Sequence, residues 1–204
     1  MHRRLAAIAT ALTLILSPAL AQDFTEAQIA EIKKGVFNDP DAPVMGNPKG
    51  DVTLVEFSDY NCGFCRKAAP DVAAFLKSDP NVKLVVHEIP IFGEGSREAA
   101  MAALAAQRQG KYPEFHSALM AMKGRAEKAS VLRVARQVGL DVDRLERDMA
   151  DPAITAQIEQ SLLLADQIGL AGTPSFVAGD RAVFGALPPE DLAELVAEAR
   201  AQKK

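Results

Sequence analysis

Residues 52–65 read VTLVEFSDYNCGFC. The first six residues are rich in β-branched and aromatic side chains and predict a central strand. A turn at 58–61 leads to Cys62, and the composition of 62–77 predicts a helix that begins at this cysteine. The stretch therefore predicts a strand, a turn and a helix, with a Cys-x-x-Cys pair where the helix starts.

The rest of the chain extends this unit into an α/β fold. The predicted elements are, in order, a strand at 82–89, a helical block at 96–168, a hairpin of strands at 175–178 and 181–184 joined by Gly179-Asp180, and a final helix from Pro188-Pro189-Glu190. The first two strands and their helix are expected to form a right-handed unit. Neither half can bury its apolar face alone, so we expect all strands in one sheet.

The N-terminus has the pattern of a cleavable secretory signal. A basic start at 1–4 precedes an apolar stretch at 5–16 and a small-x-small site that ends at Ala21. The apolar stretch is shorter than the roughly 20 residues of a membrane span. We expect delivery to the periplasm with no membrane anchor after cleavage. Cleavage removes two arginines and no acids, so the mature chain is more acidic than the formal charge of −4, which argues against a nucleic-acid partner.

The segment between the signal and the first strand is expected to hold one short helix. Thr25 and Gln28 fit a capping box, and the apolar stripe predicts a helix to about Lys34. This helix can mediate self-association or fold back on the body. Prolines and turn formers at 38–50 predict an irregular lead-in. The predicted division is 1–21 for the signal peptide, 22–50 for the N-terminal helix and linker, 51–95 for the first part of the main fold, 96–168 for the helical insertion and 169–204 for its second part.

The cysteines predict redox chemistry. Cys62 and Cys65 are the only two in the sequence. A disulfide across so short a loop removes little chain entropy, so a stabilising role is a poor explanation. Unpaired N–H groups at a helix N-terminus favour the thiolate, which is the nucleophile in disulfide exchange. We therefore expect Cys62 to be the exposed attacking sulfur and Cys65 the buried resolving one.

Two other classes of function stay open. A zinc site would need both histidines of the mature chain, His87 and His116, at spacings that fit no common zinc motif, so we expect these two residues to be structural or on the surface. Soft thiolates select Cu(I), so a periplasmic Cu(I)-binding or copper-resistance-associated protein is an alternative, although Met-rich and His-rich tracts are missing from the sequence. A partner-binding module with a structural disulfide is the third possibility.

The order of elements from about Val52 resembles the thioredoxin fold. Glu56, six residues before Cys62, and the long helical insertion before Thr173-Pro174 resemble the DsbA-like branch of that superfamily. The resemblance implies a thioredoxin fold with a helical insertion, and a cis-proline at Pro174 against the active-site disulfide. It also implies that Glu56 is a buried acid that moves the proton to and from Cys65.

The same resemblance implies an enzyme, a protein thiol–disulfide oxidoreductase acting on exported proteins. The cysteines carry the electrons, so no cofactor is implied, and a membrane redox partner must reset the pair. The motif Cys62-Gly63-Phe64-Cys65 lacks the Pro-His dipeptide of the oxidases. Together with Thr173 it resembles reductases and isomerases, which predicts a potential less oxidising than the strongest oxidants near about −120 mV.

Overall fold

A five-stranded mixed sheet forms the centre of the protein. The computed structural model describes residues 24–202, and the expected signal peptide at 1–21 lies outside this range. The strands are β1 (Val44–Gly46), β2 (Val52–Ser58), β3 (Val82–Glu88), β4 (Ser175–Ala178) and β5 (Arg181–Phe184). Their spatial order is β1-β3-β2-β4-β5, with β2 and β3 parallel and the other pairs antiparallel. β2 is therefore central, as predicted.

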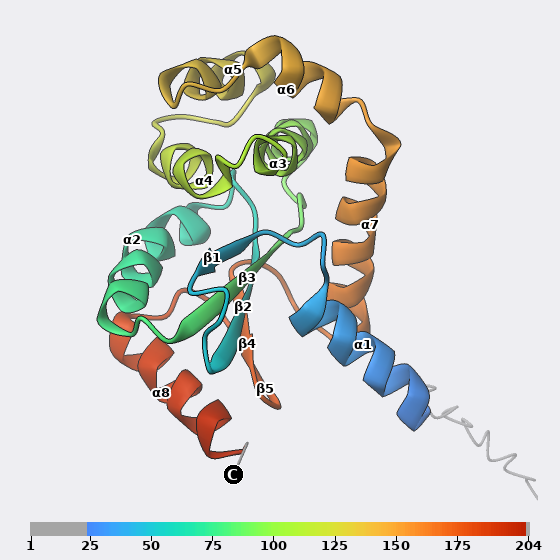
Figure 1. Ribbon diagram of the computed structural model, residues 1–204, viewed down its shortest axis with the longest axis vertical. Coiled ribbons are helices and arrows are strands. Elements are labelled where there is room, and N and C mark those ends of the chain that lie inside the picture. Colours follow the sequence, from blue (N-terminus) through green and yellow to red (C-terminus); the bar gives the residue numbers. More distant parts are fainter. Residues whose placement is uncertain (1–23, 203–204) are drawn as a thin grey trace, which may run out of the picture.

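Eight helices surround this sheet in the described part of the chain (Figure 1). They are α1 (Glu26–Asn38), α2 (Gly63–Ser78), α3 (Glu94–Gln107), α4 (Tyr112–Ala121), α5 (Lys128–Gln137), α6 (Val142–Met149), α7 (Pro152–Gln167) and α8 (Pro189–Ala201). α2 and α8 pack together on one face, and α1 and α7 on the other. The helices α3 to α6 form a block beyond one end of the sheet. Within residues 24–202, no helix combines the length and apolar character that crossing a membrane requires.

The alternation of side chains along β2 and β3 produces two apolar cores. Phe57 belongs to the smaller core, against α1 and α7, whereas Phe75 belongs to the larger one, on the α2 side. Full burial of such a ring stabilises the fold by about 1.5–3 kcal/mol. In the parallel register, Glu56 lies opposite Val86 and Ser58 lies opposite Glu88. Because alternate residues share a face, both glutamates project to the α2 side.

The N-terminal helix packs on the body of the protein. α1 contacts α7 and β2, and Val36 is buried while Ile29 stays exposed. The helix runs to Asn38, four residues beyond the predicted end. Gly35 lets this last part of the helix pack closely on α7, because a Cβ there would lie only 2.9 Å from Leu164 Cδ2. The sequence left open whether this helix mediates self-association or folds back on the body, and the structure shows it folded back.

One further local prediction was wrong. Residues 38–50 contain the short strand β1 rather than only irregular chain. Its pairing partner β3 is about 40 residues away, so the local sequence held little signal.

Candidate active site

The two cysteines lie at the N-terminus of α2, where β2 delivers them. Cys62 is the N-cap, and its Sγ accepts a hydrogen bond from the Cys65 backbone N–H at 3.4 Å. The Cys62 thiol donates to the Thr173 carbonyl at 3.3 Å. Both thiols are free, and both are buried, Cys62 with 2% and Cys65 with 0% of its surface exposed. The expectation of an exposed Cys62 was therefore wrong, because the loop at Thr173 covers it.

Burial determines the protonation of the Cys65 thiol. It raises the pKa of the Cys65 thiol well above its usual range, and the hydroxyls of Thr173 and Ser58 only partly oppose this rise. The Ser58 hydroxyl also lowers the pKa of the Glu56 carboxyl, so it lies close to both the acid and the sulfur. Cys65 therefore carries its proton at neutral pH, and must lose it before it can attack a disulfide.

The loop before β4 forms the other wall of the site. The Thr173–Pro174 peptide bond is cis. The Ser175 hydroxyl donates to the Gly172 carbonyl at 2.7 Å, and the Gly185 N–H donates to the Pro174 carbonyl at 2.9 Å. These bonds tie the loop to the β4–β5 hairpin, which fixes the Thr173 carbonyl over Cys62.

Glu56 is a buried acid on the central strand. Only 2% of its surface is exposed, and its neighbours across the sheet are Val86 on β3 and Phe176 on β4. Burial raises the pKa of its carboxyl from 4.5 to about 7. No cation lies opposite it in the sheet register to oppose this rise. Glu56 can therefore exchange a proton near neutral pH, which is what a general acid or base at this position requires.

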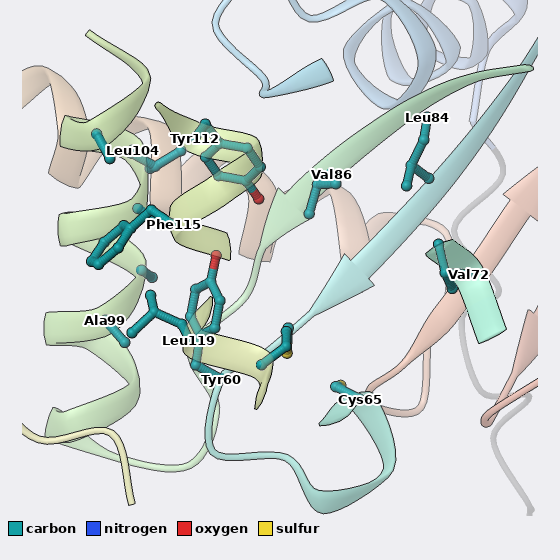
Figure 2. Close-up of a cluster of buried hydrophobic side chains, with 14 of the residues drawn as sticks. Tyr60, Cys65, Val72, Leu84, Val86, Ala99, Leu104, Tyr112, Phe115 and Leu119 are labelled. Atoms are coloured by element: carbon teal, nitrogen blue, oxygen red, sulfur yellow. The ribbon is translucent and has the colours of Figure 1, made fainter. Parts of the chain in front are cut away.

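A buried polar cluster that the sequence analysis did not predict lies next to this acid. Glu88 Oε1 accepts hydrogen bonds from the hydroxyls of Tyr60 at 2.7 Å and Tyr112 at 2.6 Å. Figure 2 shows the two tyrosines with their hydroxyls turned toward one another beside β3. The Tyr60 hydroxyl also lies 2.9 Å from His116 Nδ1. The cluster therefore joins the loop before Cys62 to the strand β3 and the helix α4.

Burial sets the protonation of this cluster. It raises the pKa of Glu88 to about 8, although the two tyrosine hydroxyls oppose the rise. It lowers the pKa of His116 to about 4, so the imidazole is neutral. The sequence offered one signal for this cluster: Tyr112 and His116 are four residues apart in a helix and so share a face.

An apolar cavity of about 320 Å³ lies behind α2, between this helix, the sheet and α4. Its walls include Met45, Leu76 and Met120, and its polar lining includes the buried residues Glu56 and His116. The sequence did not predict this cavity, because its walls come from five separate segments of the chain.

Asp59 holds the loop that carries the cysteines. Its Oδ1 accepts from the Asn61 N–H and the Ser96 hydroxyl, both at 2.7 Å. Its Oδ2 accepts from the N–H groups of Ile91 at 2.7 Å and Phe92 at 3.1 Å. One buried carboxylate thus fixes the start of α2 against the connection from β3 to α3.

A second contact ties the same loop to the helical insertion. The Asn61 side chain donates to the Ala126 carbonyl at 3.0 Å and accepts from the Ala126 N–H at 2.7 Å. Arg66 donates to the carbonyls of Tyr60 at 2.6 Å and Met122 at 3.1 Å. These anchoring roles could not be predicted from the sequence, because the contacts with Met122 and Ala126 join segments that are far apart in the chain.

Exposed apolar side chains surround this loop. Phe64 follows Cys62 within the motif and has 67% of its surface exposed. Ile91 and Phe92, which Asp59 anchors, are 47% and 46% exposed. We call Phe64, Ile91 and Phe92 the apolar rim. Large exposed apolar groups at a reactive centre are typical of a surface that binds other molecules.

Comparison with known proteins gives one family. The DSBA-like thioredoxin domain matches residues 53–197. The crystal structure of a thioredoxin-like oxidoreductase from Silicibacter pomeroyi DSS-3 is 54% identical, with a TM-score of 0.81, over 83% of this chain and 98% of that one. The thiol-disulfide exchange protein alpha-DsbA2 from Wolbachia pipientis is 32% identical, with a TM-score of 0.77, over 84% and 94%. A periplasmic thioredoxin-like protein from Salmonella enterica serovar Typhimurium is 29% identical, with a TM-score of 0.76, over 84% and 97%.

Curated relatives fall into two kinds. The Na(+)/H(+) antiporter NhaA 3 of Salinispora tropica is 33% identical over 169 residues, which cover 81% of this chain and 26% of the antiporter. The chain thus spans about a quarter of the length of the curated relatives it matches first. The thiol:disulfide interchange protein DsbA of Bordetella parapertussis is 26% identical over 184 residues, which cover 88% of this chain and 83% of that one. The predicted α/β thioredoxin fold with a helical insertion is confirmed.

Proposed function

The chain belongs to the DSBA-like thioredoxin domain family and is a thiol–disulfide oxidoreductase, and from this premise we propose that it reduces or reshuffles disulfides in exported proteins. The reaction begins when the Cys62 thiolate attacks a client disulfide and forms a mixed disulfide. Cys65 then attacks Cys62 Sγ, and the client leaves as a thiolate. Glu56 accepts the proton that Cys65 loses in this step, and returns it when the pair is reduced again.

The proposed direction of electron flow rests on the surroundings of the Cys62 sulfur. Among the described residues, its hydrogen bonds are those with the Cys65 N–H and the Thr173 carbonyl, both backbone groups. Gly63 has no side chain, and the ring of Phe64 has no hydrogen-bond donor to offer. A strong oxidant owes its potential to extra stabilisation of its reduced form. Since reduced Cys62 has so little of this stabilisation, we expect the pair to be less oxidising than the strongest oxidants, near about −120 mV.

The apolar rim supports the proposal that the clients are unfolded or misfolded proteins. Unfolded or misfolded proteins expose apolar side chains next to their cysteines, and Phe64, Ile91 and Phe92 offer matching contacts beside Cys62. The Thr173 carbonyl, next to the cis-proline Pro174, contacts the Cys62 thiol. Binding there places a client disulfide next to Cys62.

Residues 1–21 have the composition of a secretory signal, and one structural relative is described as periplasmic. Both support a location in the periplasm. There the pair needs a membrane redox partner that returns electrons to it, because each reduction of a client leaves Cys62 and Cys65 oxidised.

The equilibrium redox potential tests the proposed direction. The mature protein is equilibrated with glutathione buffers, its free thiols are alkylated, and the reduced fraction is measured by mass. A potential near about −200 mV or below supports reduction or isomerisation, whereas a value near about −120 mV would mean a net oxidant and overturn the proposal. Refolding of a scrambled disulfide protein separates the two remaining activities, because an isomerase restores its activity without net reduction.

A further inference from the structure

The main chain of Asp59 is hydrogen-bonded to both cysteines. Its carbonyl accepts from the Cys62 N–H at 3.1 Å. Its backbone N–H donates to the Cys65 sulfur: burial raises the pKa of that thiol, and this bond makes the largest of the contributions that oppose the rise. The two peptide groups of one residue therefore contact the attacking and the resolving cysteine, and a displacement of Asp59 alters the surroundings of both.

The side chain of the same residue holds the segment that carries two residues of the apolar rim. Its Oδ2 accepts from the backbone N–H groups of Ile91 and Phe92, and its Oδ1 accepts from the Ser96 hydroxyl. A carboxylate has about four acceptor positions, and the Asn61 N–H takes the remaining one. One buried residue therefore sets the position of the rim relative to the two cysteines.

The release of a client requires three sulfur atoms to lie in line. The Cys65 S–H bond breaks and its proton passes to Glu56, the Cys65 Sγ bonds to the Cys62 Sγ, and the bond from Cys62 to the client sulfur breaks. The pair is thereby oxidised and the client sulfur is reduced to a thiolate. Such a step is fastest when the attacking and the leaving atom are aligned. A client that packs on Ile91 and Phe92 has the position of its sulfur fixed by the rim.

We propose that Asp59 is a positioning residue for client release, which keeps the apolar rim in fixed register with the two cysteines and so aligns a client on the rim for attack by Cys65. The inference rests on the proposed function, because it requires clients that pack on the rim. Asp59 acts through other residues, since it is 2% exposed and does not reach a client itself. Apolar residues beside a client cysteine then determine how fast the client is released, and not only how tightly it binds.

Two peptides that differ only beside their single cysteine test this proposal. One peptide has leucines on both sides of the cysteine, and the other has serines. Reduced protein is mixed with the symmetrical disulfide of each peptide, and rapid acid quenching with mass spectrometry gives the rate at which Cys65 resolves the mixed disulfide on Cys62. We expect the leucine peptide to be released about tenfold faster than the serine peptide, a modest part of what alignment can contribute.

Substitutions of Asp59 separate positioning from a general structural role. Asp59→Ala removes the contacts with Ile91, Phe92 and Ser96 but keeps both backbone bonds to the cysteines, so the leucine peptide should slow to the rate of the serine peptide. Asp59→Asn keeps an acceptor oxygen for the two rim N–H groups and should retain most of the difference. Asp143→Asn, at an exposed position of α6, is the control and should behave like the unmodified protein. Equal slowing of both peptides in Asp59→Ala would overturn the proposal.

Phe92→Ser distinguishes the role of Asp59 from the proposed client surface. Loss of the ring should remove most of the difference between the peptides in the unmodified protein and should have no further effect in Asp59→Ala. If Phe92→Ser leaves the difference intact, clients do not pack on the rim, and the proposed surface and this inference both fail. If Phe92→Ser removes the difference and Asp59→Ala does not, the surface stands and the role of Asp59 is refuted. Neither result depends on whether the redox potential is reducing or oxidising.

Backbone NMR of the unmodified reduced protein gives a second measurement, which decides the question if Asp59→Ala does not fold. A leucine peptide with serine in place of its cysteine binds without reaction. Its binding should shift the amide signals of Ile91 and Phe92 and also that of Asp59, whose N–H donates to the Cys65 sulfur and is too deeply buried for direct contact. Shifts at Ile91 and Phe92 with none at Asp59 would show that the rim is not coupled to the resolving cysteine, and the proposal would be wrong.

Discussion

The Nδ1 atom of His116 lies 2.9 Å from the hydroxyl of Tyr60, which places a residue of the helical insertion in contact with the loop that delivers Cys62. Tyr60 in turn donates to Glu88 at the end of β3. Three segments that are distant in the sequence therefore meet directly behind the active site.

Glu56→Gln should slow the attack of Cys65 on a mixed disulfide by about a hundredfold, the usual contribution of a general base. In the unmodified protein this rate should rise with pH through about 7, as the carboxyl ionises and becomes a base. Glutamine cannot ionise, so the rise should vanish. Rapid acid quenching with mass spectrometry of a peptide mixed disulfide measures the rate. An unchanged pH profile in the variant would exclude Glu56 as the base.

Glu88→Gln should raise stability at alkaline pH. The folded pKa of Glu88, about 8, lies above the ordinary value of 4.5, so the folded state binds the proton more tightly than the unfolded state does. The stabilisation is complete below pH 4.5 and is lost as the pH rises through about 8. Glutamine keeps an acceptor for both tyrosines and has no charge to bury.

Urea unfolding at about pH 5 and about pH 9 measures this effect on either side of the titration. From the lower to the higher pH, the free energy of unfolding of the unmodified protein should fall by on the order of 1–3 kcal/mol more than that of Glu88→Gln. Glu114→Gln, at an exposed position of α4, is the control and should follow the unmodified protein. Equal losses in all three proteins would mean that Glu88 does not titrate as its burial requires.

Cys65→Ser should trap clients on Cys62, because the attack that releases them is removed. Cys62→Ser should form no such adducts, since Cys65 is fully buried and protonated. Non-reducing electrophoresis and mass spectrometry of periplasmic extracts would show the adducts. Adducts on Cys65 in the Cys62→Ser variant would reverse the assignment of the two sulfurs.

Asn61→Ala should destabilise the protein by about 1–3 kcal/mol, because it leaves the N–H and carbonyl of Ala126 without their partner. Asn38→Ala, at the exposed end of α1, is the control and should cost little. Thermal unfolding compares the two. A cost for Asn61→Ala no larger than that of the control would mean that the contact between this loop and the insertion contributes nothing to folding.

Phe64→Ser should raise KM for a peptide disulfide severalfold and leave the rate with a small symmetrical disulfide nearly unchanged. The ring is 67% exposed, so its removal costs little stability but takes apolar contact area from a bound client. Leu163→Ser, an exposed apolar position on α7, serves as the control. Equal effects on the peptide and on the small disulfide would show that Phe64 acts on the cysteines and not on the client.

Local patterns were enough to predict the elements that carry the chemistry. The turn at Gly179-Asp180 was predicted from two residues, whereas the burial of Glu56 was implied by the resemblance to the DsbA-like proteins. Contacts between distant segments could not be predicted in this way. Cys62 is buried by a carbonyl 111 residues away, and the cluster around Glu88 needs three segments to meet. Such features arise from tertiary packing, which no local pattern of residue types encodes.

The chain leaves the sheet for the helical block after β3 and returns to it at β4, on the two sides of β2. Ile91 and Phe92 lie at the first of these junctions and Thr173 at the second, so both junctions border the cysteines. The block also contacts the loop that carries Cys62, through Met122, Ala126 and His116, so a change in the block that alters either junction also reaches the Cys-x-x-Cys pair. The surface around the cysteines and the cysteines themselves are thus constrained to change together in evolution.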